Sequence, residues 1–170
     1  PTALITPTGE ILIDKQRASE VKDVTAVGHE VFHRLLDSKF EIKNFDDWKT
    51  QDKNLKKTEE DWESEKNELN KKKNKTISKF KNILQKRNKQ AFKEIQERVK
   101  GYVNDGILTE EESVNSDEWV TGFFDLVGSG KLTFKNEGFW VNVGDWIREV
   151  LFKPFGYNNL NFKSGRQVYD

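Results

Sequence analysis

Apolar residues recur along the chain in two patterns, one typical of strands and the other typical of helices. Residues 3–14 alternate around a Thr-Pro-Thr-Gly turn, which predicts a short β-hairpin. Residues 18–38 carry apolar side chains at three- and four-residue spacing, which predicts an amphipathic helix. Residues 117–127 and 145–152 predict two further helices that are rich in apolar side chains.

A long polar stretch, residues 49–100, lies between these segments and contains neither Gly nor Pro. Leu55, Trp62 and Leu69 fall seven residues apart, and a thin apolar stripe continues beyond the lysine-rich residues 71–75. Such a narrow stripe is typical of a coiled coil. We therefore expect one long helix or a helical hairpin, with the lysine-rich residues as the place where the chain turns back.

These elements together predict an α+β fold that is predominantly α. Residues 1–48 and 101–170 are expected to form one small core, in which the hairpin packs with the helices. Residues 49–100 are expected to form a long polar helical insertion between the two halves of that core.

Composition and charge exclude several classes of protein. The chain has 170 residues, 29 basic and 29 acidic side chains and no cysteine. Balanced charge argues against a general nucleic-acid-binding protein, and the absence of cysteine excludes disulfides, cysteine-ligated zinc and thiol nucleophiles. No apolar run approaches the roughly 18–20 residues of a membrane span, and no signal peptide is visible. Because the chain begins with Pro1 and contains no methionine, we expect it to be part of a longer polypeptide.

The two histidines of the chain stand together in the sequence His29-Glu30-Val31-Phe32-His33. Positions i and i+4 of a helix lie on the same face, so that both imidazoles can reach one metal ion. Zn²⁺ suits two imidazoles and a carboxylate, and it acidifies a bound water. Glu30 is then the candidate general base, which takes a proton from that water.

The third ligand must be an oxygen atom, because no further histidine exists. Asp37 is a poor candidate, since roughly 12 Å of helix axis separates it from His29. Glu118, which opens an apolar helix, is the predicted ligand, and Asp117 is the alternative. Glu118 is also placed to complement the positive end of its own helix. Asp125 is expected to orient a histidine N–H.

The motif helix carries a family resemblance. The stretch VTAVGHEVFHRLLD resembles the active-site helix of zincin metallopeptidases, and Asp117-Glu118-Trp119 before Phe123-Phe124 resembles the downstream glutamate helix of gluzincin-like members. The order of features is similar to that of zincin-like domains in large polyvalent proteins of phages and conjugative elements. The resemblance implies a zincin-like core, a zinc-dependent peptidase, and a place in a phage virion or the host bacterial cytoplasm.

Two main functions follow from these features, and a third, a nucleic-acid-associated protein that uses the basic run Lys71–Lys100, is disfavoured by the acidic residues before that run. The first is a zinc metallopeptidase that acts on a protein or peptide, on other segments of its parent polypeptide or on virion proteins. The second is a catalytically degenerate zincin scaffold that serves as a structural or interaction component of the virion through its helical insertion. Neither a nucleic acid nor a membrane is expected as a partner.

Overall fold

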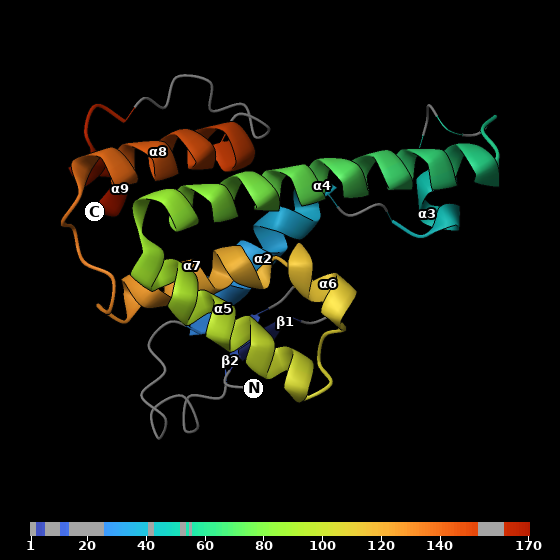
Figure 1. The fold of residues 1–170 in the computed structure, drawn as a ribbon. Coiled ribbons are helices and arrows are strands. Elements are labelled where there is room, and N and C mark those ends of the chain that lie inside the picture. Colours follow the sequence, from blue (N-terminus) through green and yellow to red (C-terminus); the bar gives the residue numbers. More distant parts are fainter. Residues whose placement is uncertain are drawn as a thin grey trace.

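The computed structural model describes residues 3–5, 11–13, 26–40, 43–51, 54, 56–152 and 162–170. These residues form two strands and a series of helices, joined by turns and loops, and Figure 1 shows their arrangement. The elements, in chain order, are β1 (Ala3–Ile5), β2 (Ile11–Ile13), α2 (Ala26–Phe40), α3 (Phe45–Lys49), α4 (Glu59–Arg87), α5 (Lys89–Asn104), α6 (Glu110–Val114), α7 (Glu118–Gly128), α8 (Glu137–Ile147), the π-helical turn η1 (Arg148–Phe152) and α9 (Gly165–Tyr169).

The expected α+β core is wrong, because the described part of the chain is almost entirely helical. β1 and β2 pair with each other antiparallel, with Leu4 opposite Leu12, and both lie against α2. The other described elements are helices, so this short pair supplies no sheet on which a mixed core could be built. The predicted helix is observed from Ala26 onward, and residues 18–25 lie outside the described residues.

The polar stretch between residues 49 and 100 forms α3, α4 and most of α5. Helix α4 begins at a capping box in which Thr58 accepts the Asp61 N–H and the Asp61 carboxylate accepts the Thr58 N–H. It continues without interruption through Lys71–Lys75, where a turn was expected, because neither Gly nor Pro interrupts the helix there. The break falls at Asn88, whose side chain accepts the Ala91 N–H and so starts α5.

Aromatic side chains from several helices meet in the centre of the molecule. Phe80 of α4 lies 5.3 Å from Phe123 of α7 and 4.6 Å from Trp146 of α8, measured between ring centroids. Phe123 also lies 5.8 Å from Trp140 of α8. The second half of α4 and α5 add further fully or nearly fully buried side chains to the same core: Ile77, Leu84, Ala91, Ile95 and Val99.

This packing gives the polar stretch two different parts. The second half of α4 and α5 belong to the core, whereas the first half of α4 extends away from it with α3 alongside (Figure 1). The division of the chain into a core and an insertion stays a prediction. None of the described helices is both long and apolar enough to span a lipid bilayer.

Replacement of Phe123 by Ala tests the importance of this aromatic core. Phe123 is completely buried, so Phe123→Ala leaves a cavity and should lower the free energy of unfolding by about 3–5 kcal/mol. The control is Ile107→Ala, since Ile107 is 65% exposed, and it should change stability by less than about 0.5 kcal/mol. Urea unfolding measures both, and equal losses in the two variants would contradict the assignment of the core.

Candidate metal centre

Helix α2 presents both histidines to α7. The ring of Phe32 stacks on Phe124 of α7 with 3.5 Å between centroids and 4° between planes, and Leu36 is completely buried. These contacts fix the rotation of α2 about its axis. His29 and His33 therefore lie at the interface of the two helices, with side chains 13% and 19% exposed.

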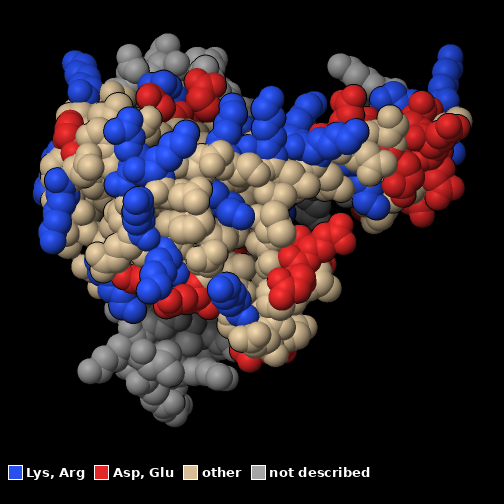
Figure 2. All heavy atoms as spheres, viewed as in Figure 1, with Lys and Arg blue, Asp and Glu red and all other residues tan. Residues whose placement is uncertain are grey.

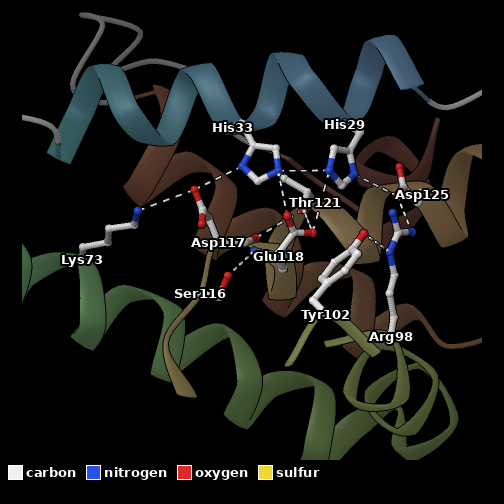
Figure 3. Close-up of polar contacts among 10 residues, drawn as sticks. All are labelled: His29, His33, Lys73, Arg98, Tyr102, Ser116, Asp117, Glu118, Thr121 and Asp125. Carbon is white, nitrogen blue, oxygen red and sulfur yellow. Dashed lines mark hydrogen bonds and ion pairs between the residues drawn. The ribbon is translucent and has the colours of Figure 1, made fainter. Parts of the chain in front are cut away.

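Helix α7 carries the acidic side chains that face these histidines. Glu118 is its first residue and Asp125 lies seven residues later, two turns along the same face. Asp117 immediately precedes the helix. The beginning of α7 meets His33 and its later part meets His29, so α2 and α7 run antiparallel at the site (Figure 3).

Three side chains bring potential ligand atoms close together. The Nε2 atoms of His29 and His33 lie 3.0 Å apart. Glu118 Oε1 lies 3.3 Å from His33 Nε2, and Glu118 Oε2 lies 3.8 Å from His29 Nε2. One ligand atom from each residue falls within 4.8 Å of the other two. The group of His29, His33 and Glu118 could therefore hold a metal ion.

Two further carboxylates fix the orientation of the imidazoles. His29 Nδ1 lies 2.9 Å from Asp125 Oδ2, and His33 Nδ1 lies 3.1 Å from Asp117 Oδ2. An ionised carboxylate can only accept hydrogen bonds, so each Nδ1 carries the hydrogen. The Nε2 atom of each ring is consequently the one that turns toward Glu118 (Figure 3).

The two orienting carboxylates are in turn held by cations from the polar stretch. Arg98 Nη1 of α5 lies 2.6 Å from Asp125 Oδ2, and Lys73 Nζ of α4 lies 3.5 Å from Asp117 Oδ2. Arg98 also donates from Nε to the Tyr102 hydroxyl over 2.9 Å. Burial raises the pKa of the Tyr102 phenol.

The carboxylates shift the proton affinity of His33. Burial alone would lower the pKa of His33, but hydrogen bonds to Asp117 and Glu118 outweigh it and raise the pKa to about 10. Burial likewise opposes ionisation of Asp117, yet the hydrogen bond from His33 and the charge of Lys73 lower its pKa to about 2. In the absence of metal, His33 therefore carries a second proton, on Nε2, at neutral pH, and a metal ion must displace it.

The structure brings together the three residues predicted as ligands. Asp117, the alternative third ligand, instead accepts a hydrogen bond from the far nitrogen of His33. Glu30 follows His29 on α2 with a half-buried side chain, and among the described residues no hydrogen bond or ion pair engages its carboxylate. Asp125 orients His29, as expected from its spacing to Glu118.

Sequence reasoning did not identify the two cations. Lys73 stands within a run of lysines, and Arg98 stands among alternating charges on α5. Neither position is distinguished from its neighbours by spacing or composition. Only the path of α4 and α5 past the beginning and end of α7 reveals them.

Comparisons with known proteins return no relative. A scan against protein-family models finds no match. The searches of curated proteins and of solved structures also find none. The case for a metal ion rests on the donor atoms of His29, His33 and Glu118.

The raised pKa of His33 predicts how the stability of the metal-free protein varies with pH. The interactions of protonated His33 stabilise the fold fully below its unfolded pKa of about 6.5, and this contribution is lost as the pH rises toward about 10. When a chelator keeps the protein free of metal, the free energy of unfolding should therefore fall between about pH 6.5 and pH 10, and it should fall more steeply in the original protein than in His33→Gln. Urea titrations at several pH values measure the difference, and parallel curves would contradict the prediction.

The orienting role of Asp125 predicts an effect on metal affinity. Asp125→Asn keeps the size of the side chain but removes the charge that fixes His29, and it should weaken metal binding about 10- to 100-fold. Asp145→Asn is the matched control, because Asp145 pairs with Arg148 on the surface of α8 and its side chain is 56% exposed. Competition with a chromophoric zinc chelator measures both affinities, and equal affinities would exclude the orienting role.

Proposed function

We propose that the chain is a zinc-dependent peptidase in which His29, His33 and Glu118 hold the metal ion. The support is geometric. Tetrahedral ligands about 2.0–2.1 Å from Zn²⁺ stand about 3.3 Å from one another. The two imidazole Nε2 atoms lie 3.0 Å apart, Glu118 Oε1 lies 3.3 Å from His33 Nε2, and the other oxygen, Oε2, lies 3.8 Å from His29 Nε2. With one ligand atom taken from each residue, all three atoms lie within 4.8 Å of one another.

The donor set favours zinc over other common metal ions. Ca²⁺ and Mg²⁺ prefer sites made of oxygen atoms alone, whereas two imidazoles suit Zn²⁺. Three protein ligands leave a fourth position open, which is typical of catalytic rather than structural zinc. Asp125 and Asp117, which bind the far nitrogens of the imidazoles, are the supporting contacts that such sites use.

The chain's own residues supply the remaining chemistry. A bound zinc ion would provide a Lewis acid that polarises a peptide carbonyl and acidifies water. Glu30 would accept the proton of the attacking water on its carboxylate and return it to the departing amine. Its position next to His29 in the sequence and its half-buried side chain support this role.

The proposed substrate is a protein or peptide. The ligand set, two histidines of one helix and a glutamate of another, resembles that of the gluzincin-like peptidases. The similarity of the motif helix to those of phage domains extends the proposal to virion proteins and to other segments of a larger polypeptide.

Metal analysis gives the first test. The purified chain should hold about one zinc ion per molecule, and His29→Ala or Glu118→Gln should lose it. Glu110→Gln is the control, because Glu110 lies on the exposed helix α6. Failure of the original protein to bind added zinc would rule out the proposed centre.

The role of Glu30 requires a separate test. Glu30→Gln should keep the zinc ion but lower the rate of hydrolysis of an unstructured protein such as casein by about 10²- to 10⁴-fold. Glu110→Gln again serves as the control and should hydrolyse at the original rate. Retained zinc without any hydrolysis that depends on Glu30 would assign the centre to the alternative function, a metal-stabilised scaffold.

A further inference from the structure

Charge is divided along α4 and the start of α5, although the whole chain has equal numbers of acidic and basic side chains. Residues 59–68 contain six Asp or Glu and one Lys, whereas residues 69–93 contain ten Lys or Arg and neither Asp nor Glu. Figure 2 shows Lys and Arg side chains in a row along the upper edge of α4 and Asp and Glu gathered at its far end. The balanced total therefore conceals a strongly basic surface.

Four lysines of α4 form a stripe on its outer face. Lys71, Lys75, Lys79 and Lys86 follow one another at spacings of four, four and seven residues, which places them on one side of a helix. All four are exposed, and they lie opposite the side of α4 that packs into the core. This lysine stripe extends over about 22 Å at 1.5 Å per residue.

The fold does not account for the lysine stripe. None of its four side chains lies within ion-pair distance of an Asp or Glu in the described part of the chain. The inward-facing Lys73 and Lys81, by contrast, bind Asp117 and the carbonyl of Val114. Like charges one helical turn apart repel each other and weaken a helix. Repulsion among Lys71, Lys75 and Lys79 thus works against the stability of α4, whereas Lys86 lies in the last turn and complements the helix dipole. A bound anion would offset this repulsion.

A pocket continues the basic surface around the end of α4. It has a volume of about 250 Å³ and lies between the turn that joins α4 to α5 and the loop before α8. Arg87, Lys131 and Lys135 line it, and Glu94 is its one acidic lining residue. No described carboxylate lies within ion-pair distance of these three cations. The pocket offers room and charge for a phosphate group.

We propose that the lysine stripe and this pocket bind the phosphate backbone of a nucleic acid. Asn82, which lies on the outer face between Lys79 and Lys86, is exposed and polar. A protein partner is generally bound through desolvated apolar and aromatic side chains, which this face lacks among the described residues. Lysines in a polar row instead suit the regular negative charge of a nucleic acid, which they neutralise without reading its sequence.

Salt dependence gives a direct test. Fluorescence anisotropy with a labelled DNA duplex and with one of its strands should show binding at low salt. If all seven cations of the stripe and pocket contact phosphates, the logarithm of the binding constant should fall with the logarithm of salt concentration at a slope of about −6 for the duplex and about −5 for the single strand. Lys75→Gln/Lys79→Gln should make this slope shallower by about two and weaken binding at least about tenfold at low salt. The matched control is Lys49→Gln/Lys56→Gln, which removes two exposed lysines at the acidic end of α4.

The possible outcomes separate this proposal from the others. An unchanged zinc content and unfolding curve in the stripe variant would show that its loss of binding is specific to the surface. An equal loss of DNA affinity in Lys49→Gln/Lys56→Gln would show that binding depends only on net charge, and it would overturn the proposal. Polyglutamate that binds as tightly as DNA would assign the face to acidic polypeptides, and no DNA binding at low salt would also overturn it.

Discussion

The antiparallel contact between α2 and α7 is the interaction on which the structure of the centre depends. The stacked rings of Phe32 and Phe124 set the distance and rotation of the two helices. With this rotation, His29 and His33, which lie one turn apart on α2, face Asp125 and Asp117, which lie about two turns apart on α7. A different rotation would turn the imidazoles away from the carboxylates, and each buried polar group would lose its hydrogen bond. Apolar packing and the polar centre therefore require the same arrangement.

The centre also depends on charge balance over a wider region. Asp117 just before α7, together with Glu118 and Asp125 within it, brings three negative charges to the side of α7 that meets α2, and partial burial makes their mutual repulsion costly. Lys73 and Arg98 offset this repulsion from two other helices. Helices α4 and α5 thus contribute to the core on their apolar sides and to the centre through one cation each.

The sequence was more informative about the centre than about the fold. Spacing alone placed His29 and His33 on one face, and the absence of a third histidine left a carboxylate as the remaining ligand, because these arguments depend on helix geometry and residue chemistry. The turn expected at Lys71–Lys75 occurs instead at Asn88, where a single capping side chain starts α5. The phase of the apolar stripe did not indicate this position. The α+β core was wrong although β1 and β2 pair with each other as expected, because the buried core side chains of the described residues come mainly from the helices.

The separation of the site residues along the chain has a consequence for folding. His33 and Asp117 are 84 positions apart, and His29 and Asp125 are 96 apart, so that these contacts form only when most of the chain is already in place. An ion held by α2 and α7 would act as a cross-link that closes the long segment of chain between these two helices. In a chain without cysteine, such an ion would provide the kind of cross-link that a disulfide provides elsewhere. Because it would bind the folded state alone, it would raise the stability of that state in proportion to the logarithm of metal concentration.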